Sequence, residues 1–292
     1  MFEPQAPPRH PTPPPRPHWG AEALWQAMVP LLPGLSIEVV QTLDSTNSEL
    51  TDRLRNAGRV QQDRRGGRIG DLSPQMLVAI HQTAGRGRLG RRWHAAPGSS
   101  LTFSLALPLQ REDWSGLSLA VGLAVAEALD PQGGRIGLKW PNDLILSEGA
   151  GAEPGRKLGG ILIESVPVGA QRAAVIGIGV NVLPQPVSEA DYGAAALAEI
   201  WPEATPQDTL ARIGEPLART LLAFERDGFA PLQEAYARRD VLRGHPVRTT
   251  DAEMPDGVAA GVDADGALKV AADGRTRRIV SGEVSVRLAG AT

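Results

Sequence analysis

The chain has 292 residues with 30 basic and 33 acidic side chains, and its formal net charge is −3, so it lacks the basic excess that is typical of general nucleic-acid binders. Its hydrophobic content of 42% excludes a fully disordered chain, and the absence of cysteine excludes disulfides, thiolate zinc sites and cysteine nucleophiles. The longest apolar stretch, residues 117–129, contains Glu127 and is too short to cross a bilayer. No secretory signal is visible at the N-terminus. These features favour a soluble cytoplasmic protein.

The first 20 residues are rich in proline and predict a disordered or polyproline-II tail. A solvated extension is favoured there over an SH3-type ligand. Residues 21–32 place apolar side chains at helical spacing, which predicts one short helix. A helix-turn-helix DNA-binding domain needs at least two packed helices, so the sequence does not predict one.

The middle of the chain predicts strands and helices in mixed order. Strands are expected at residues 36–43, 76–81, 99–107, 136–140, 143–147, 158–166 and 173–182. Helices are expected at residues 49–57, 116–130, 206–226 and 231–240. Residues 58–74 are polar and rich in glycine and charge, which predicts a mobile surface insertion, and residues 149–156 predict a flexible loop.

From residue 244 onward the pattern changes to short β-rich runs. These runs lie at residues 246–249, 258–262, 267–271 and 276–280. Asp-Gly turn signals separate the last three of them, and such closely spaced short strands predict a small barrel. The expected organisation is therefore a tail (1–20), a large domain of helices and strands (21–241) and a small β domain (242–290).

Residues 85–93, the arginine-glycine loop, hold four arginines and three glycines. Arginines at this density repel one another unless an anion joins them, and glycines let backbone N–H groups approach an anion closely. Arginine also grips a carboxylate at two points. An RNA-binding loop or a solvated arginine run is the alternative. The flanking predicted strands place the loop on a rigid scaffold, where ligand sites usually lie, and this favours an anion-binding loop.

Two further segments carry charged groups beside predicted strands. In residues 139–143, the KWPND turn, Lys139 ends a strand and Asp143 follows a proline turn. A lysine near a carboxylate can hold a polyphosphate together with its Mg²⁺, although a surface turn with a salt bridge is the alternative. Lys157 comes directly before a strand that Gly159 and Gly160 open to close packing, which is a weak signal alone.

Two other segments combine small or polar residues with predicted elements. In residues 177–182 (GIGVNV), glycine often marks close approach by a ligand. Asn181 needs hydrogen-bond partners if it is buried, so a core role and a ligand contact both stay open for it. Residues 44–47 (DSTN) precede the helix that contains Glu49 and predict a helix cap, which is compatible with ligand binding at the same place.

Together and in this order, these segments resemble the biotin–protein ligase family. The matching segments are residues 44–47 (DSTN), 82–93 (QTAGRGRLGRRW), 139–144 (KWPNDL), 157–164 (KLGGILIE) and 177–182 (GIGVNV). The resemblance covers roughly residues 36–288. It implies an α+β fold, with a catalytic domain like that of class II aminoacyl-tRNA synthetases and an SH3-like C-terminal β-barrel. Since only a tail and one predicted helix come first, the chain resembles the monofunctional ligases that lack the DNA-binding domain.

The resemblance also implies an ATP-dependent ligase reaction in two steps. Biotin is activated as biotinyl-5′-AMP, and the biotinyl group then passes to a lysine of a biotin carboxyl carrier protein or domain of acetyl-CoA carboxylase or another biotin-dependent carboxylase. The implied cofactors are ATP and Mg²⁺. No nucleic-acid or membrane partner is expected, and a homodimer is allowed. A lipoate-type ligase shares this logic, but the arginine-glycine loop favours biotin, and the acidic net charge disfavours an RNA-binding module.

Site residues follow from motif position within the resemblance. The implied catalytic residues are Arg86, Arg88, Lys139 and Lys157. The implied biotin-binding residues are Ser45, Thr46, Asn47, Gln82, Arg86, Gly87, Arg88, Lys157, Gly159, Gly160 and Ile161. The implied nucleotide-binding residues are Arg88, Trp93, Lys139, Asn142, Asp143 and Asn181, with Asp143 also expected near Mg²⁺. Leu89 departs from the family pattern, which is often basic at this position.

Overall fold

A computed structural model describes residues 19–63, 72–147, 155–185, 193–280 and 287–288. The predicted tail up to residue 18 and most of the predicted 149–156 loop therefore lie outside the described residues. Helix α1 (Ala21–Met28) and strand β1 (Ser36–Leu43) form where the sequence predicts them.

Seven strands form one mixed sheet. They are β1, β2 (Gln75–Gln82), β3 (Ser100–Pro108), β4 (Ile136–Lys139), β5 (Asp143–Leu146), β6 (Arg156–Val168) and β7 (Gln171–Asn181). Their order across the sheet is β1-β2-β3-β7-β6-β5-β4. The β1–β2 pair is parallel, and the other neighbours are antiparallel. This mixed sheet confirms the predicted α+β class.

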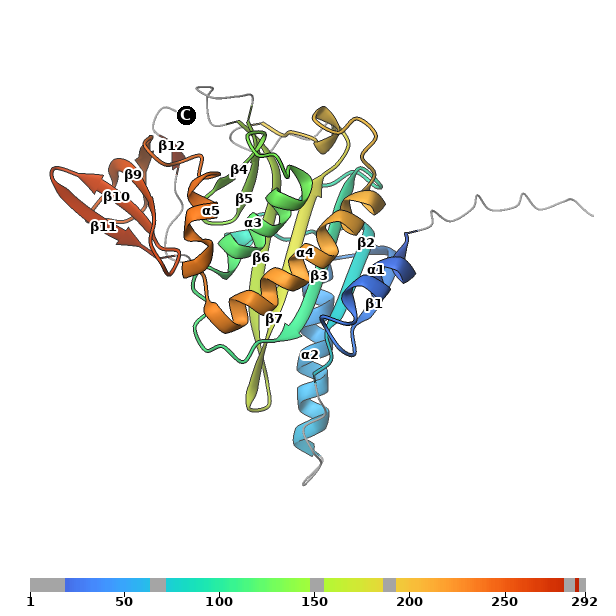
Figure 1. Cartoon of the computed structure of the whole chain (residues 1–292). Helices are drawn as coiled ribbons and strands as arrows, with labels where there is room; N and C mark the ends of the chain where they lie inside the picture. Colours follow the sequence, from blue (N-terminus) through green and yellow to red (C-terminus); the bar gives the residue numbers. More distant parts are fainter. Residues whose placement is uncertain (1–18, 64–71, 148–154, 186–192, 281–286, 289–292) are drawn as a thin grey trace, which may run out of the picture.

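Helices cover both faces of this sheet (Figure 1). The helices are α2 (Thr46–Asp63), α3 (Leu117–Leu129), α4 (Pro206–Asp227) and the short α5 (Gln233–Ala237). Helices α3 and α4 pack on one face, and α2 packs on the other, each over its own cluster of buried apolar side chains. Consequently β3 is buried on both faces instead of alternating between core and solvent.

Two helix predictions need correction. Helix α2 starts at Thr46 and ends at Asp63, inside the predicted insertion. It starts early because the Ser45 carbonyl accepts from the Glu49 N–H at 3.0 Å, and it passes through Gly58 because that glycine packs directly on Val168. The helix predicted at residues 231–240 is a 3₁₀ turn followed by α5. Its last residues leave the helix to bond β4, where the Leu138 N–H donates to the Arg239 carbonyl at 2.7 Å.

The C-terminal strands form a second, wholly antiparallel sheet, as the sequence predicts (Figure 1). They are β8 (Pro246–Arg248), β9 (Asp256–Val262), β10 (Leu268–Ala272), β11 (Arg275–Ile279) and β12 (Arg287–Leu288). The β9–β10 turn contacts the larger part of the chain, where the buried Trp140 Nε1 donates to the Gly266 carbonyl at 3.0 Å. Gly266 has φ +82°, and a Cβ there would lie 2.7 Å from Gly116 Cα, so this close contact requires glycine. Within the described chain, the helices are all too short or too polar to cross a membrane.

Candidate active site

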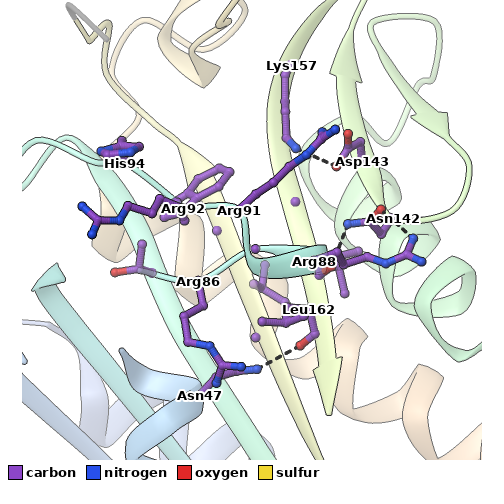
Figure 2. Close-up of a pocket in the computed structure, with 18 of the residues that line it drawn as sticks. Asn47, Arg86, Arg88, Arg91, Arg92, His94, Asn142, Asp143, Lys157 and Leu162 are labelled. Carbon is purple, nitrogen blue, oxygen red and sulfur yellow. Dashed lines mark hydrogen bonds and ion pairs between the residues drawn. The ribbon is translucent and has the colours of Figure 1, made fainter. Parts of the chain in front are cut away.

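A cavity of about 620 Å³ lies where the arginine-glycine loop, the KWPND turn and the start of α2 meet β3, β6 and β7 (Figure 2). A volume of this size is ordinary for a site that takes a cofactor-sized ligand. The cavity brings together nearly all the predicted site residues: Ser45, Thr46, Asn47, Gln82, Arg86, Gly87, Arg88, Trp93, Lys139, Asn142, Asp143, Lys157, Gly160, Ile161 and Asn181.

Gly159 is the exception among the predicted site residues. It does not line the cavity, and a Cβ on it would lie 2.6 Å from the Gly179 carbonyl oxygen and 2.9 Å from Leu144 Cδ1. Neighbouring residues of a strand point to opposite faces, so Gly160 meets the cavity while Gly159 allows close packing of β5, β6 and β7. Its predicted contact with biotin finds no support in this geometry.

The end of the cavity formed by α2 and β2, the α2 end, is a network of buried neutral groups. The Thr46 N–H donates to Gln82 Oε1 at 2.7 Å. Ser104 Oγ lies 2.6 Å from Thr46 Oγ1 and 2.6 Å from Asn47 Oδ1. Ser45, Thr46, Asn47 and Ser104 are each at most 3% exposed, so these groups satisfy one another as buried polar groups must. The expected capping role of Ser45 is also present, since its Oγ accepts from the Ser48 N–H at 3.4 Å.

Two glycines of β7 make room for the two ends of the cavity. A Cβ on Gly177 would lie 2.2 Å from Asn47 Oδ1, and a Cβ on Gly179 would lie 2.6 Å from Trp93 Cε2. Real Cβ atoms do not approach other atoms this closely. The close approach expected at these glycines is therefore made by protein side chains.

The arginine-glycine loop is held by its own backbone. The Trp93 N–H donates to the Gly85 carbonyl at 2.9 Å, and the Gly87 N–H donates to the Arg91 carbonyl at 2.8 Å. Its tip is Leu89, which has φ +56° and is 73% exposed. The loop thus presents its side chains from a closed, hydrogen-bonded frame.

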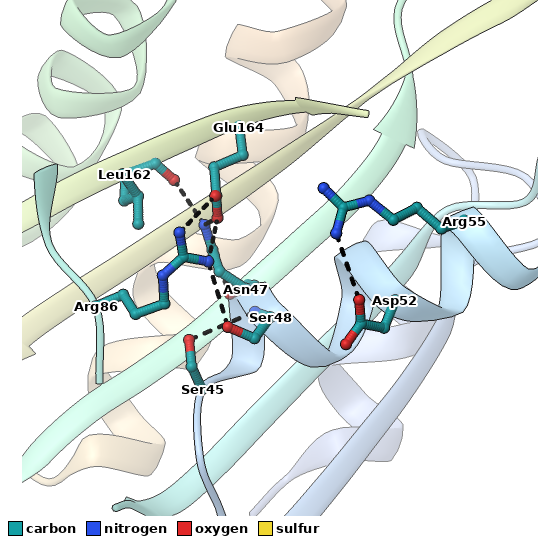
Figure 3. Close-up of polar contacts among 9 residues, drawn as sticks. Ser45, Asn47, Ser48, Asp52, Arg55, Arg86, Leu162 and Glu164 are labelled. Carbon is teal, nitrogen blue, oxygen red and sulfur yellow. Dashed lines mark hydrogen bonds and ion pairs between the residues drawn. The ribbon is translucent and has the colours of Figure 1, made fainter. Parts of the chain in front are cut away.

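Arg86 is bound to the protein at the base of this loop (Figure 3). Its Nη2 lies 3.0 Å from Glu164 Oε1, and its Nη1 lies 3.3 Å from Ser48 Oγ. From the family resemblance, Arg86 was expected to face an anionic ligand, and no role was predicted for Glu164. In the structure, the Glu164 carboxylate already neutralises this guanidinium.

The other end of the cavity, the KWPND end, is charged (Figure 2). Arg88 Nη1 donates to Asn142 Oδ1 at 3.2 Å, and Lys157 Nζ lies 2.8 Å from Asp143 Oδ1. Burial lowers the pKa of Arg88, an effect that the nearby Asp143 charge opposes. Lys139 is 6% exposed.

Cations outnumber carboxylates around this cavity. Of the described residues that line it, the carboxylate is Asp143, and the cations are Arg86, Arg88, Arg91, Arg92, Lys139 and Lys157. A concave surface lined by one sign of charge concentrates ligands of the opposite sign. Within the described part of the chain, no group of three or more His, Cys, Asp or Glu side chains could hold a metal ion.

Asn181 has protein partners as well as a place in the cavity wall. Its Oδ1 accepts from Gln185 Nε2 at 3.2 Å, and its Nδ2 donates to the Lys157 carbonyl at 3.4 Å. Gln185 Oε1 in turn accepts from the Ala96 N–H at 2.8 Å. Nearby, Trp93 Nε1 is buried without a hydrogen-bond partner among the described residues.

Three polar residues that contribute to the site were not predicted from the sequence, namely Ser104, Glu164 and Gln185. Ser104 is paired with Gly177 across β3 and β7, which brings its hydroxyl beside Asn47. The alternation of Ser100, Thr102 and Ser104 with apolar residues along β3 was the available signal for Ser104. No local signal separates Gln185 from an ordinary loop residue.

Two family models match this chain. The Biotin/lipoate A/B protein ligase family matches residues 71–181, and the Biotin protein ligase C terminal domain matches residues 246–287.

Named proteins match over most of the chain. The bifunctional ligase/repressor BirA of Escherichia coli is 33% identical over 267 residues, covering 88% of this chain and 76% of that protein. The biotin–[acetyl-CoA-carboxylase] ligase of Mycobacterium tuberculosis is 32% identical over 263 residues, covering 85% and 88%.

The fold matches a solved structure of biotin protein ligase from Aquifex aeolicus in complex with biotin and ATP. The TM-score is 0.69 at 26% identity, covering 87% of this chain and 99% of that one. The family models, the relatives and this structure agree with the fold described above. The chain therefore belongs to the biotin protein ligase family, and it is a ligase.

Proposed function

We propose that this chain activates biotin with ATP as biotinyl-5′-AMP in the cavity described above and then transfers the biotinyl group to a lysine of a biotin carboxyl carrier domain. One observation carries the proposal: a single cavity joins a neutral hydrogen-bonding end to a cationic end in a member of this ligase family. Biotin combines a neutral ureido ring system with a carboxylate, and ATP brings the phosphates. The two ends match these two kinds of chemistry.

The first step brings two anions together. A carboxylate oxygen of biotin attacks the α-phosphorus of ATP, the bond from that phosphorus to the bridging oxygen breaks, and pyrophosphate leaves. Cations placed around the reacting atoms screen the repulsion and stabilise the charge that develops on phosphorus. We assign this work to Lys139, Lys157 and Arg88, whose charges act more strongly because they are partly withdrawn from water.

The second step transfers the biotinyl group. The neutral amine of the carrier lysine attacks the carbonyl carbon of the mixed anhydride, its extra proton is released, and AMP leaves. Water must be kept out until then, because the anhydride hydrolyses. We assign this exclusion to the arginine-glycine loop, in which Arg86 and Gly87 form the base and Arg88 contacts the KWPND turn.

The remaining residues divide between the two ends. Ser45, Thr46 and Gln82 are assigned to the ureido ring system, and Asn47 supports them from behind through Ser104. The backbone at Gly160 and Ile161 provides the floor. The residues assigned to the nucleotide are Trp93, Asn142 and Asn181. Trp93 Nε1 is buried and has no hydrogen-bond partner among the described residues, which favours a ligand acceptor near it.

Mg²⁺ belongs to the proposal as the ion that accompanies ATP. Mg²⁺ is usually held by one or two carboxylates together with substrate phosphates, and the described lining residues supply one carboxylate, Asp143. This donor set fits an ion delivered with the triphosphate. When bound, the ion would neutralise phosphate charge beside Asp143.

We further propose the carrier domain of acetyl-CoA carboxylase or of another biotin-dependent carboxylase as the partner, in line with the name of the Mycobacterium tuberculosis relative. A cytoplasmic location, no nucleic-acid partner and an allowed homodimer complete the proposal. We likewise propose that the chain divides near residue 241. The tail and the catalytic domain come before this point, and the C-terminal domain comes after it.

The test uses the purified full chain with ATP, Mg²⁺, biotin and a carrier domain. We expect pyrophosphate release that depends on biotin, biotinyl-AMP detected by mass spectrometry, and a carrier that gains the mass of one biotinyl group. Lipoate in place of biotin, and a carrier whose acceptor lysine is changed to arginine, are the matched controls. Absence of biotin-dependent pyrophosphate release would overturn the proposal.

A further inference from the structure

Glu164 of β6 lies where the start of α2 meets the arginine-glycine loop (Figure 3). Its carboxylate accepts from Asn47 Nδ2 at 2.9 Å and from Arg86 Nη2 at 3.0 Å, and its side chain is 25% exposed. A carboxylate ion has acceptors and no donor. It therefore dictates the direction of every hydrogen bond that it makes.

This constraint and the backbone carbonyl of Leu162 together fix the amide of Asn47. The two Nδ2 hydrogens face the Leu162 carbonyl at 3.2 Å and the Glu164 carboxylate at 2.9 Å, and both of these partners are acceptors. The amide oxygen must then point the other way, where it lies 2.6 Å from Ser104 Oγ. The Asn47 amide is thus fully engaged by the protein, although the residue is part of the cavity wall.

The same constraint passes from Asn47 to Thr46. An amide oxygen cannot donate, so the Ser104 hydroxyl gives its proton to Asn47 Oδ1. Ser104 has no second proton, so it can only accept at its 2.6 Å contact with Thr46 Oγ1. Gln82 Oε1, which lies 3.1 Å from the same hydroxyl, is a second acceptor for the Thr46 proton. The Thr46 proton is therefore held between two protein acceptors, and the hydroxyl offers its lone pairs at the cavity wall.

Gln82 completes the pattern. Its Oε1 accepts from the Thr46 backbone N–H at 2.7 Å, so its Nε2 is the group left to donate. The α2 end of the cavity consequently offers an acceptor at Thr46 and a donor at Gln82. A ureido group carries two N–H donors and one carbonyl acceptor, which is the complementary set.

We propose that Glu164 is a positioning residue that sets the donor–acceptor polarity of the α2 end, acting through Asn47 and Ser104 on Thr46, with Arg86 compensating its charge. This inference rests on the proposed function, because the ureido group of biotin is the ligand group that it matches. An unpaired carboxylate here would be costly, which gives the Arg86 contact a purpose other than ligand binding.

The decisive variant is Glu164→Gln, which keeps the shape and adds a donor. The Leu162 carbonyl alone then favours the present orientation of the Asn47 amide. Where the amide turns over, Ser104 donates to Thr46 instead and occupies a Thr46 lone pair that otherwise faces the cavity. A polar mismatch with a buried ligand group corresponds to about a 10- to 100-fold loss. We expect the KM for biotin to rise by about this factor, while the KM for ATP stays within about twofold and the melting temperature stays unchanged.

Two further measurements distinguish a change in the donor–acceptor arrangement of the α2 end from a nonspecific loss of activity. Discrimination between biotin and a biotin methylated at a ureido nitrogen should fall in Glu164→Gln, because the acceptor that reads the N–H is lost. Ser104→Ala interrupts the same chain of bonds and should raise the KM for biotin without raising that for ATP. The control is Glu38→Gln, which removes a carboxylate bound to Arg53 at 2.6 Å and should change neither constant.

The outcomes distinguish this inference from the proposed function. A wild-type chain that makes no biotinyl-AMP overturns the proposed function. An active wild type together with a Glu164→Gln variant whose KM for biotin is unchanged, or whose two KM values rise equally, overturns the role of Glu164 alone. If Glu164→Gln does not fold, Ser104→Ala decides by the same criterion.

Discussion

The two ends of the cavity differ in the chemistry that they offer a ligand. At the α2 end, the neutral groups of Thr46 and Asn47 are 3% exposed and are bonded to other parts of the protein. At the KWPND end, ionised side chains such as Lys157 and Asp143 face each other beside further cations. On the function proposed above, the neutral end selects its ligand group by hydrogen-bond direction and shape, whereas the charged end selects by net charge. One sheet supports both, because β7 passes beneath them.

Removal of a cation from the KWPND end should cause the largest loss of activity. Lys157→Ala leaves the Asp143 carboxylate without its ion-pair partner and the two reacting anions without one screening charge. We expect kcat/KM for biotin-dependent pyrophosphate release to fall by about 100- to 1000-fold. Lys269→Ala, a change in the C-terminal sheet, is the matched control. A Lys157→Ala enzyme that keeps a tenth of the activity would remove this lysine from the mechanism.

Two alanine substitutions on β7 should sharpen the division between the ends. Gly177→Ala places a Cβ 2.2 Å from Asn47 Oδ1, and Gly179→Ala places one 2.6 Å from Trp93 Cε2. Such overpacking costs about 1–3 kcal/mol, so we expect roughly a tenfold or greater rise in the KM for biotin with the first variant and in the KM for ATP with the second. Steady-state kinetics with each substrate varied in turn measures both. Equal effects of the two variants on both substrates would contradict the division.

A substitution at Asp240, which does not line the cavity, should leave the KM values for biotin and ATP unchanged. Burial raises the pKa of Asp240 to about 6, and its Oδ2 is buried without a hydrogen-bond partner among the described residues. The folded pKa lies above the ordinary 3.8, so the stabilising protonated form is fully present below about pH 4 and is lost as the pH rises through 6.

Asp240→Asn should abolish this loss. We expect the variant to gain up to about 3 kcal/mol in the free energy of unfolding relative to wild type between pH 4 and pH 7.5, with unchanged KM values. Urea unfolding at the two pH values measures it. Parallel pH profiles for the two proteins would count against the raised pKa.

The charged half of the site could be predicted from the sequence because its residues are local to recognisable turns. Lys139 and Asp143 lie on either side of one proline turn, and Lys157 is the second residue of β6, which pairs with β5. The turn allowed either a polyphosphate site or a surface salt bridge, and Lys157 was a weak signal alone. The family resemblance joined the three residues, and the cavity contains all three. The strand and helix pattern similarly predicted both sheets.

The neutral half could be predicted only in part, because it depends on packing between distant segments. Ser104 meets Asn47 only when α2 lies across β3, and Glu164 meets Arg86 across 78 positions of the chain. The difference between Gly159 and Gly160 depends on which face of β6 turns to the cavity. The low helix propensity of Gly58 also predicted too early an end for α2, because it takes no account of the packing of Gly58 on Val168.

The hydrogen bond from Trp140 Nε1 to the Gly266 carbonyl has a consequence for any attempt to trim this chain. A fragment that stops before residue 246 would strip a buried indole of its acceptor, at a cost of about 1–3 kcal/mol, directly beside Lys139. We expect the KWPND turn to loosen as a result, which would displace Lys139 and Asp143 from their positions in the cavity. A minimal version of this enzyme must therefore retain the second sheet, supplied either in the same polypeptide or as a complementing piece.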